Sequence, residues 1–179
     1  MVKSNDMANT YKKVYIHLVF AVKNRNSLLE KEWRSSVFRY ISGIVSERGH
    51  YSLSVGGYND HVHILFDYNL KELIPDLVRE IKKASTKFIK EQGLSKYKFE
   101  WQSGYGVFSV GWREKENLIE YFRNQDEHHG IRSFRQEYLS LLQKFEIEFK
   151  DEYVFKFFNE GLNDLCSQKQ LLINKISKW

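Results

Sequence analysis

The sequence of 179 residues contains only one cysteine, Cys166, and only one proline, Pro75. A single cysteine rules out an intramolecular disulfide and a zinc site built from a cysteine cluster. No apolar run approaches the roughly 20 residues that a membrane-spanning helix needs. The polar first eleven residues also lack the apolar segment of a signal peptide. These absences argue against a disulfide-rich secreted protein and a membrane protein, so we expect a cytoplasmic protein with no membrane partner.

Charge and aromatic content are compatible with nucleic-acid binding. Lysine and arginine number 28 against 23 aspartate and glutamate residues, which gives a net charge of +5 and a pI near 9.1. Such an excess suits a polyanionic partner, and the aromatic side chains, 16% of all residues, can stack on bases. Many proteins of this composition bind no nucleic acid, so composition permits this function without showing it.

Apolar periodicity predicts one domain of alternating strands and helices. We expect strands at residues 14–22, 52–56, 61–68 and 105–110, and helices at 30–47, 74–93 and 114–127. This order is typical of a ferredoxin-like βαββαβ sandwich, an α+β fold with an antiparallel sheet and helices on one face. Residues from Phe134 onward are predicted to add C-terminal helices. Because this fold carries many unrelated functions, function has to be inferred from the site residues.

The first candidate site is the pair His61 and His63 in the strand 61–68. Residues two apart in a strand project from the same face, so both imidazoles point one way while Val62 points into the core. Two parallel imidazoles can serve as adjacent ligands of one metal ion. A solvated pair on an edge strand is the alternative interpretation of the same spacing.

The second candidate is Tyr121 with Gln125, which are four residues apart and so share one face of a helix. They can be ordinary hydrogen-bonding residues at the border of the apolar stripe. The functional interpretation is a nucleophile one helical turn from an oxygen ligand of the same metal ion.

A row of basic residues follows the exposed face of the helix 74–93. Its members, with two more after the first strand, are the candidate DNA-binding residues Arg79, Lys83, Lys87, Lys90, Lys23 and Arg25. Such a row is usually the solvated face of an amphipathic helix. If nucleic acid binds, the row provides phosphate contacts.

Two segments that contain these site residues resemble a known family. Residues 57–65 read Gly-Tyr-Asn-Asp-His-Val-His-Ile-Leu, and residues 121–129 read Tyr-Phe-Arg-Asn-Gln-Asp-Glu-His-His. With residues 16–20 and 101–106, they resemble in order and spacing the HUH motif and tyrosine helix of the single-tyrosine transposases of the smallest bacterial insertion sequences. The related repetitive-palindrome-associated tyrosine transposases are included in this resemblance, which covers residues from about 14 to 155.

The resemblance implies a role for each residue of the motif. His61, His63 and Gln125 match the metal ligands, and Tyr121 matches the nucleophile. Apart from the resemblance, Asp60 is a candidate to orient one histidine, although a turn residue before a strand needs no function. The implied enzyme is a homodimer that uses Mg²⁺ or Mn²⁺, and Tyr121 can complete the partner subunit's site in trans. It cleaves and rejoins single-stranded DNA at hairpin-bearing element ends through a 5′-phosphotyrosine intermediate. We therefore expect a flexible tail at residues 1–10, an HUH tyrosine transposase domain at 11–155, and a C-terminal helical extension at 156–179.

Other classes of protein share parts of this pattern. A nucleic-acid-binding ferredoxin-like module without catalysis would present exposed aromatic residues on its central strands, where the strand 61–68 has histidines instead. Replication initiators and plasmid relaxases of the HUH class are usually longer or circularly arranged. A domesticated family member that serves a host repeat element would keep the same residues, because the difference lies in the DNA that flanks the gene.

Overall fold

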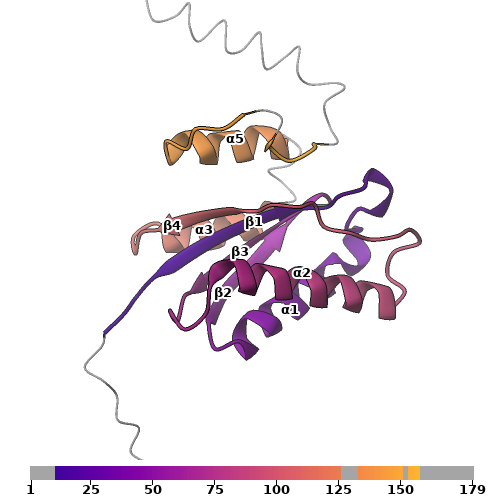
Figure 1. The fold of residues 1–179 in the computed structure, drawn as a ribbon, viewed down its shortest axis with the longest axis horizontal. Coiled ribbons are helices and arrows are strands. Elements are labelled where there is room, and N and C mark those ends of the chain that lie inside the picture. Colours follow the sequence, from indigo (N-terminus) through magenta and orange to yellow (C-terminus); the bar gives the residue numbers. More distant parts are fainter. Residues whose placement is uncertain (1–10, 126–132, 151–152, 158–179) are drawn as a thin grey trace, which may run out of the picture. The chain divides into compact units, whose positions relative to one another are not determined.

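A computed structural model describes residues 11–125, 133–150 and 153–157. The chain forms two compact units, Met1–Gln125 and Asp126–Trp179, shown in Figure 1. The predicted tail at residues 1–10 lies outside the described residues, as does all of the predicted extension beyond residue 157.

The first unit has the predicted βαββαβ order. Its elements are β1 (Tyr15–Ala21), a short 3-10 helix (Arg25–Ser27), α1 (Lys31–Glu47), β2 (Tyr51–Gly57), β3 (His61–Asp67), α2 (Ile74–Glu91), β4 (Gly106–Val110) and α3 (Lys115–Arg123). The strands form one sheet in the order β2-β3-β1-β4, and all neighbouring pairs are antiparallel. The ferredoxin-like α+β fold is therefore confirmed, with α1 and α2 together on one side of the sheet (Figure 1).

One face of the sheet forms the main core with α1 and α2. Alternate side chains of the two central strands point to this face, as the sequence predicts: Ile16, Leu18, Phe20, Val62, Ile64 and Phe66. The helices contribute apolar side chains at helical spacing: Trp33, Val37, Ile41 and Val45 from α1, and Leu77, Val78, Ile81 and Ile89 from α2. Pro75 occupies the first turn of α2, where its missing N–H costs no helical hydrogen bond.

The opposite face of the sheet carries α3. Here Tyr15, Leu65 and Phe122 form a small buried cluster, against which Leu118 and Tyr121 of α3 also pack. β1 is consequently buried on both faces along its whole length. α3 ends at Arg123, within the helix predicted at 114–127, and Asn124 leaves helical geometry with φ −97° and ψ 17°; residues 126–127 lie outside the described residues.

The second unit contains α5 (Phe134–Lys144), which agrees with the C-terminal helices predicted from Phe134 onward. Ser133 begins it with a capping box, in which its hydroxyl accepts from the Gln136 N–H while the Gln136 side chain accepts from the Ser133 N–H. Phe134 and Tyr138 pack against Phe155, with ring centroids 5.8 and 4.7 Å apart. Among the described residues of either unit, no helix is both long and apolar enough to cross a membrane.

Candidate functional site

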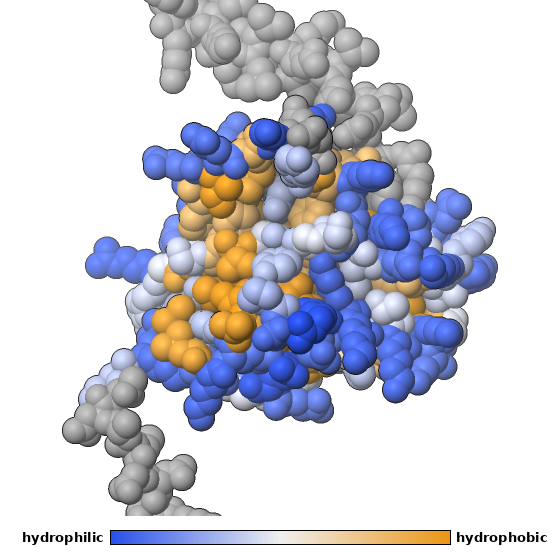
Figure 2. All heavy atoms as spheres, in the orientation of Figure 1, coloured by the Kyte–Doolittle hydropathy of each residue, from blue (hydrophilic) through white to orange (hydrophobic). Residues whose placement is uncertain are grey.

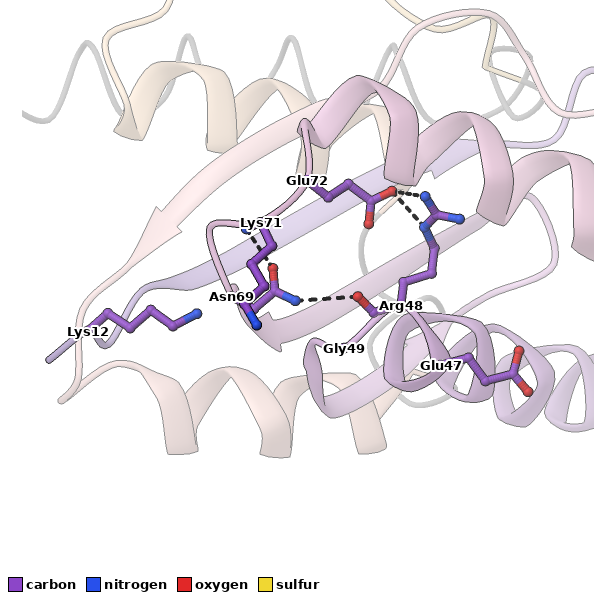
Figure 3. Close-up of a pocket in the computed structure, with 7 residues that line it drawn as sticks. All are labelled: Lys12, Glu47, Arg48, Gly49, Asn69, Lys71 and Glu72. Carbon is purple, nitrogen blue, oxygen red and sulfur yellow. Dashed lines mark hydrogen bonds and ion pairs between the residues drawn. The ribbon is translucent and has the colours of Figure 1, made fainter. Parts of the chain in front are cut away.

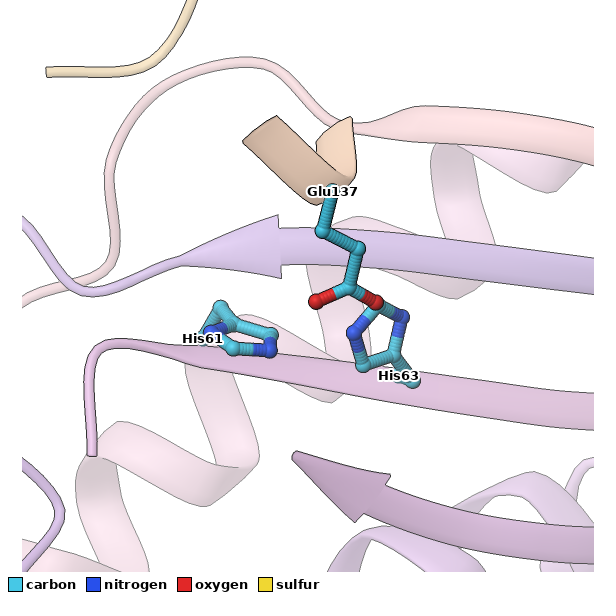
Figure 4. Close-up of side chains that lie close together, drawn as sticks. All are labelled: His61, His63 and Glu137. Atoms are coloured by element: carbon cyan, nitrogen blue, oxygen red, sulfur yellow. The ribbon is translucent and has the colours of Figure 1, made fainter. Parts of the chain in front are cut away.

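His61 and His63 project together from β3 on the face that carries α3. Both side chains are fully buried, and their ring centroids are 4.7 Å apart with nearly perpendicular planes. Figure 4 shows the two rings side by side above the strand; Glu137, also labelled there, belongs to α5 of the other unit. The structure thus brings the two predicted ligands together in a buried position, so they are not a solvated pair on an edge strand.

The ring of His61 is oriented by the turn that precedes it. Nδ1 of His61 lies 2.7 Å from Oδ1 of the buried Asp60, so the imidazole donates from Nδ1 to the carboxylate. The turn depends on Gly57, whose φ is +141° and where a Cβ would lie 2.4 Å from the backbone oxygen of His61. Asp60 is therefore hydrogen-bonded to one of the two histidines, as an orienting residue would be.

The ring of His63 is oriented by a neighbouring strand. Its Nδ1 lies 2.9 Å from Nε2 of His17 in β1. Because Nδ1 of both site histidines is engaged in a hydrogen bond, Nε2 is the nitrogen through which each would bind a cation. This interaction joins residues 46 apart in the sequence and was not predicted from it.

Tyr121 lies beside this pair in the same chain. Its half-buried ring is 6.4 Å from the His63 ring, measured between centroids. The next residue, Phe122, stacks on His63 at 5.1 Å and also contacts the ring of His17 at 5.2 Å. The α3 helix therefore holds the predicted nucleophile against the histidine face.

Gly56 of β2 makes this close approach possible. It pairs with His63 in the sheet, and a Cβ at this position would lie 2.8 Å from the backbone oxygen of Phe122 and 2.9 Å from its Cβ. Real Cβ atoms essentially never approach so closely, so α3 can dock here only because residue 56 has no side chain. The sequence contains Gly56 directly before the turn, but its role depends on where α3 docks.

Gln125 follows α3 and is 2% exposed. Within the described part of the chain, neither its amide oxygen nor its amide nitrogen has a hydrogen-bond partner. A buried amide without partners is costly, and a bound water or ion is one way to satisfy it. Two imidazole nitrogens together with an amide oxygen would suit a divalent cation, and Mn²⁺ better than Mg²⁺, which prefers oxygen.

Residues 10–125 match the family model described as "Transposase IS200 like". The chain belongs to this family. No curated protein matches it. Two solved structures share the fold of this transposase. One is a protein of Deinococcus radiodurans R1 assigned as a transposase, with 24% identity and a TM-score of 0.53 over 66% of this chain and 95% of that chain. The other is a REP-associated tyrosine transposase bound to a REP hairpin, with 15% identity and a TM-score of 0.50. The match covers 86% of this chain and 93% of that chain.

The predicted basic row of the transposase lies away from the histidines. Its four members on α2 are all exposed, and the surface over α2 is predominantly hydrophilic in Figure 2. Arg79 pairs with Asp76 at 2.8 Å and Lys87 with Glu91 at 3.6 Å. Because α2 covers the other face of the sheet, this row and the histidines are on opposite sides.

Lys23 lies closer to the histidine end of the sheet. The preceding residue, Val22, donates its N–H to the backbone oxygen of Asp60 at 2.8 Å. The exposed ammonium of Lys23 pairs with Glu100 at 3.1 Å. The other predicted residue of this region, Arg25, begins the 3-10 helix.

Lys82 of α2 links this helix to the segment before β4. Its ammonium donates to the backbone oxygens of Gln102 and Gly104 and lies over the ring of Phe20 at 5.2 Å. Burial lowers its pKa from 10.5 to about 8. Lys82 was not singled out from the sequence, because it belongs neither to the apolar stripe nor to the regular basic row.

A separate open pocket of about 630 Å³ lies at the other end of β3. Figure 3 shows its lining, from Lys12 before β1, the end of α1 and the loop after β3. The Arg48 guanidinium and His50 both bond the Glu72 carboxylate, and the Arg48 hydrogen bond lowers the pKa of Glu72. These contacts join the end of α1 to the loop before α2. The charged residues of this pocket therefore have a structural role.

Proposed function

We propose that this transposase cuts and rejoins single-stranded DNA by metal-assisted transesterification. Tyr121 is the nucleophile, and His61, His63 and Gln125 hold the metal ion. The observation that carries the proposal is the position of Tyr121 beside His63, in one chain and on the face where both histidines are buried and oriented. The family supports DNA processing in general, and this geometry supports the particular chemistry.

The reaction replaces one phosphodiester bond by another. A phenol with an ordinary pKa near 10 is a weak nucleophile at neutral pH. A divalent cation at the histidines would neutralise charge on the phosphate and so favour attack. The Tyr121 oxygen forms a bond to phosphorus, the bond from phosphorus to the 3′ oxygen breaks, and the departing oxygen takes up a proton as the phenol loses one.

The product of that step is a DNA 5′-phosphate on Tyr121 and a free 3′-hydroxyl. The phosphotyrosine ester retains the energy of the original bond, so a 3′-hydroxyl of another strand can reverse the attack without ATP. Asp60 fixes the ring of His61 during both steps through its hydrogen bond to Nδ1. A hydrolase that activated water would have no use for the tyrosine.

We propose hairpin-bearing single-stranded DNA ends as the substrate. One solved relative is bound to a REP hairpin, and the basic surface of this chain suits phosphate contacts. We propose that Lys23 contacts DNA near the histidines, together with Arg25 two residues further along the chain. DNA that also reaches Arg79, Lys83, Lys87 or Lys90 has to pass around an edge of the sheet, because α2 lies on the opposite face.

We also propose that Tyr121 serves the histidines of its own chain, within the homodimer that the family resemblance implies. Packing of α3 on its own sheet through Gly56 and Phe122 supports this arrangement. Exchange of α3 between subunits would produce the trans arrangement instead.

The chemistry is tested with single-stranded oligonucleotides from the ends of the element around the gene. Protein and oligonucleotide are incubated with Mn²⁺ or Mg²⁺, and a covalent protein–DNA band is sought on a denaturing gel. We expect a metal-dependent band that disappears in Tyr121→Phe and persists in the matched control Tyr51→Phe, since Tyr51 is exposed at the start of β2. Hairpin binding by the wild-type protein without any covalent band would instead favour a binding module without catalysis.

The choice between cis and trans is tested by mixing two inactive variants. Tyr121→Phe retains the histidines, and the double variant His61→Ala, His63→Ala retains the tyrosine. We expect no covalent band from the mixture after subunit exchange. Recovery of the band would show that Tyr121 completes the partner's site, and a sizing measurement on the same samples establishes whether the chains associate.

A further inference from the structure

His17 is a buried histidine that the proposed chemistry does not use directly. It lies in the middle of β1, is 2% exposed, and pairs with Leu65 in the antiparallel register. His63 is two residues before Leu65 and therefore points to the same face, diagonally across from His17. The two rings have centroids 5.1 Å apart, and Nε2 of His17 lies 2.9 Å from Nδ1 of His63.

We propose that His17 is a positioning residue that holds His63 in the tautomer and orientation needed to bind metal through Nε2. This inference rests on the proposed function in taking His63 as a ligand. A neutral imidazole that binds metal through Nε2 carries its hydrogen on Nδ1. The short contact then requires that Nδ1–H of His63 donates to Nε2 of His17, and that His17 carries its own hydrogen on Nδ1.

The packing around His17 fixes the acceptor nitrogen in place. Its ring contacts Phe108 of β4 at 5.8 Å and Phe122 of α3 at 5.2 Å, measured between centroids. Phe122 also stacks on His63, with the ring planes at 29°. Both imidazoles are thus held between the sheet and one aromatic ring. A buried hydrogen bond of this kind has little competition from water.

The two site histidines then have equivalent but chemically different partners. Asp60 accepts from Nδ1 of His61 through a carboxylate, and His17 accepts from Nδ1 of His63 through a neutral ring nitrogen. Such outer partners fix the ligand ring and set its basicity, and their loss typically weakens metal affinity by about 10–100-fold. A residue that only filled space would not determine which ring nitrogen of His63 carries the hydrogen.

The first test measures the tautomer of His63 in the full-length, metal-free protein by ¹⁵N NMR of the histidine ring nitrogens. We expect the Nδ1–H form in the wild type. His17→Gln keeps an oxygen acceptor near the position of Nε2 and should preserve that form, whereas His17→Phe keeps the ring volume without an acceptor and should shift His63 towards Nε2–H. An Nε2–H form of His63 in the wild type overturns the inference without any variant.

The second test measures Mn²⁺ affinity of the same proteins by electron paramagnetic resonance. We expect His17→Phe to bind about 10–100-fold more weakly than wild type, with rescue by His17→Gln. His50→Phe is the matched control, because it also removes a buried histidine with ring hydrogen bonds, but at the other end of β3. Its stability should fall while its Mn²⁺ affinity is retained.

The outcomes separate this inference from the proposed function. If wild-type protein binds no Mn²⁺ that depends on His61 or His63, the metal centre of the proposed function is refuted, and the NMR measurement still decides the role of His17. If wild type binds Mn²⁺ and folded His17→Phe binds it equally well, His17 is a packing residue and the inference is refuted.

Discussion

Replacement of Gly56 by alanine should separate α3 from the sheet and impair both stability and cleavage. The added Cβ would lie 2.8 Å from the Phe122 backbone oxygen and 2.9 Å from its Cβ, whereas ordinary contacts begin near 3.4 Å. The nearer atom is backbone and the other is the Cβ attached to it, so no flexible side-chain end can move aside. The helix must shift outward by roughly half an ångström or more, and a gap of that size already loses a quarter or more of each dispersion contact.

The expected loss is in the range of about 1–3 kcal/mol that overpacking usually costs, measured as the free energy of unfolding from urea denaturation. The same shift moves Tyr121 relative to His63, so the yield of covalent protein–DNA product should fall further than the folded fraction does. Gly43→Ala is the matched control: nothing lies within 4 Å of a Cβ there, and alanine in this helix should stabilise by about 0.5–1 kcal/mol. If the midpoint of urea unfolding and the yield of covalent product of Gly56→Ala both equal those of the wild type, the close packing of α3 on β2 is wrong.

Two further substitutions test the layer between α2 and the sheet. The buried indole N–H of Trp101 donates to the Ser85 hydroxyl at 3.0 Å. Ser85→Ala removes this acceptor and should lower the free energy of unfolding by about 1–3 kcal/mol. An unchanged free energy of unfolding would contradict this expectation. The pKa of Lys82 is about 8 in the folded protein and 10.5 in its ordinary state. Between these two pH values the unfolded protein therefore binds more protons than the folded protein, so the free energy of unfolding should rise with pH. Allowing for its partial exposure, we expect a rise of about 1–2 kcal/mol relative to Lys82→Met between pH 8 and 10, and parallel stability profiles would refute it.

The sequence predicts those features that follow from local periodicity. Alternation in the strand 61–68 places His61 and His63 on one face, and the helical stripes of α1 and α2 identify the core side. The positions of all four strands follow from the same patterns within one or two residues. Sequence spacing is a weaker guide to Tyr121 and Gln125, because α3 ends at Arg123 and Asn124, which lies between them, leaves helical geometry.

The features that the sequence does not predict depend on how distant segments align. His17 reaches His63 only because β1 pairs with β3 in one register; a slip of one residue would turn His17 to the opposite face. Gly56 acquires its role only when α3 docks on β2. A histidine inside an otherwise apolar strand is unusual, so the sequence does mark His17 as a residue to examine. It does not identify the partner, which is 46 residues away.

The two faces of the sheet bury different kinds of side chain. The α1 and α2 face has six alternate side chains of β1 and β3 that are at most 7% exposed and wholly apolar, so it can account for most of the hydrophobic stabilisation. The α3 face instead buries three histidines, whose polar nitrogens must be matched by hydrogen bonds or a cation. A small cluster around Phe122 holds α3 there. Substitutions under α1 and α2 should therefore abolish folding and cleavage together, whereas those under α3 should reduce cleavage while the sheet remains folded.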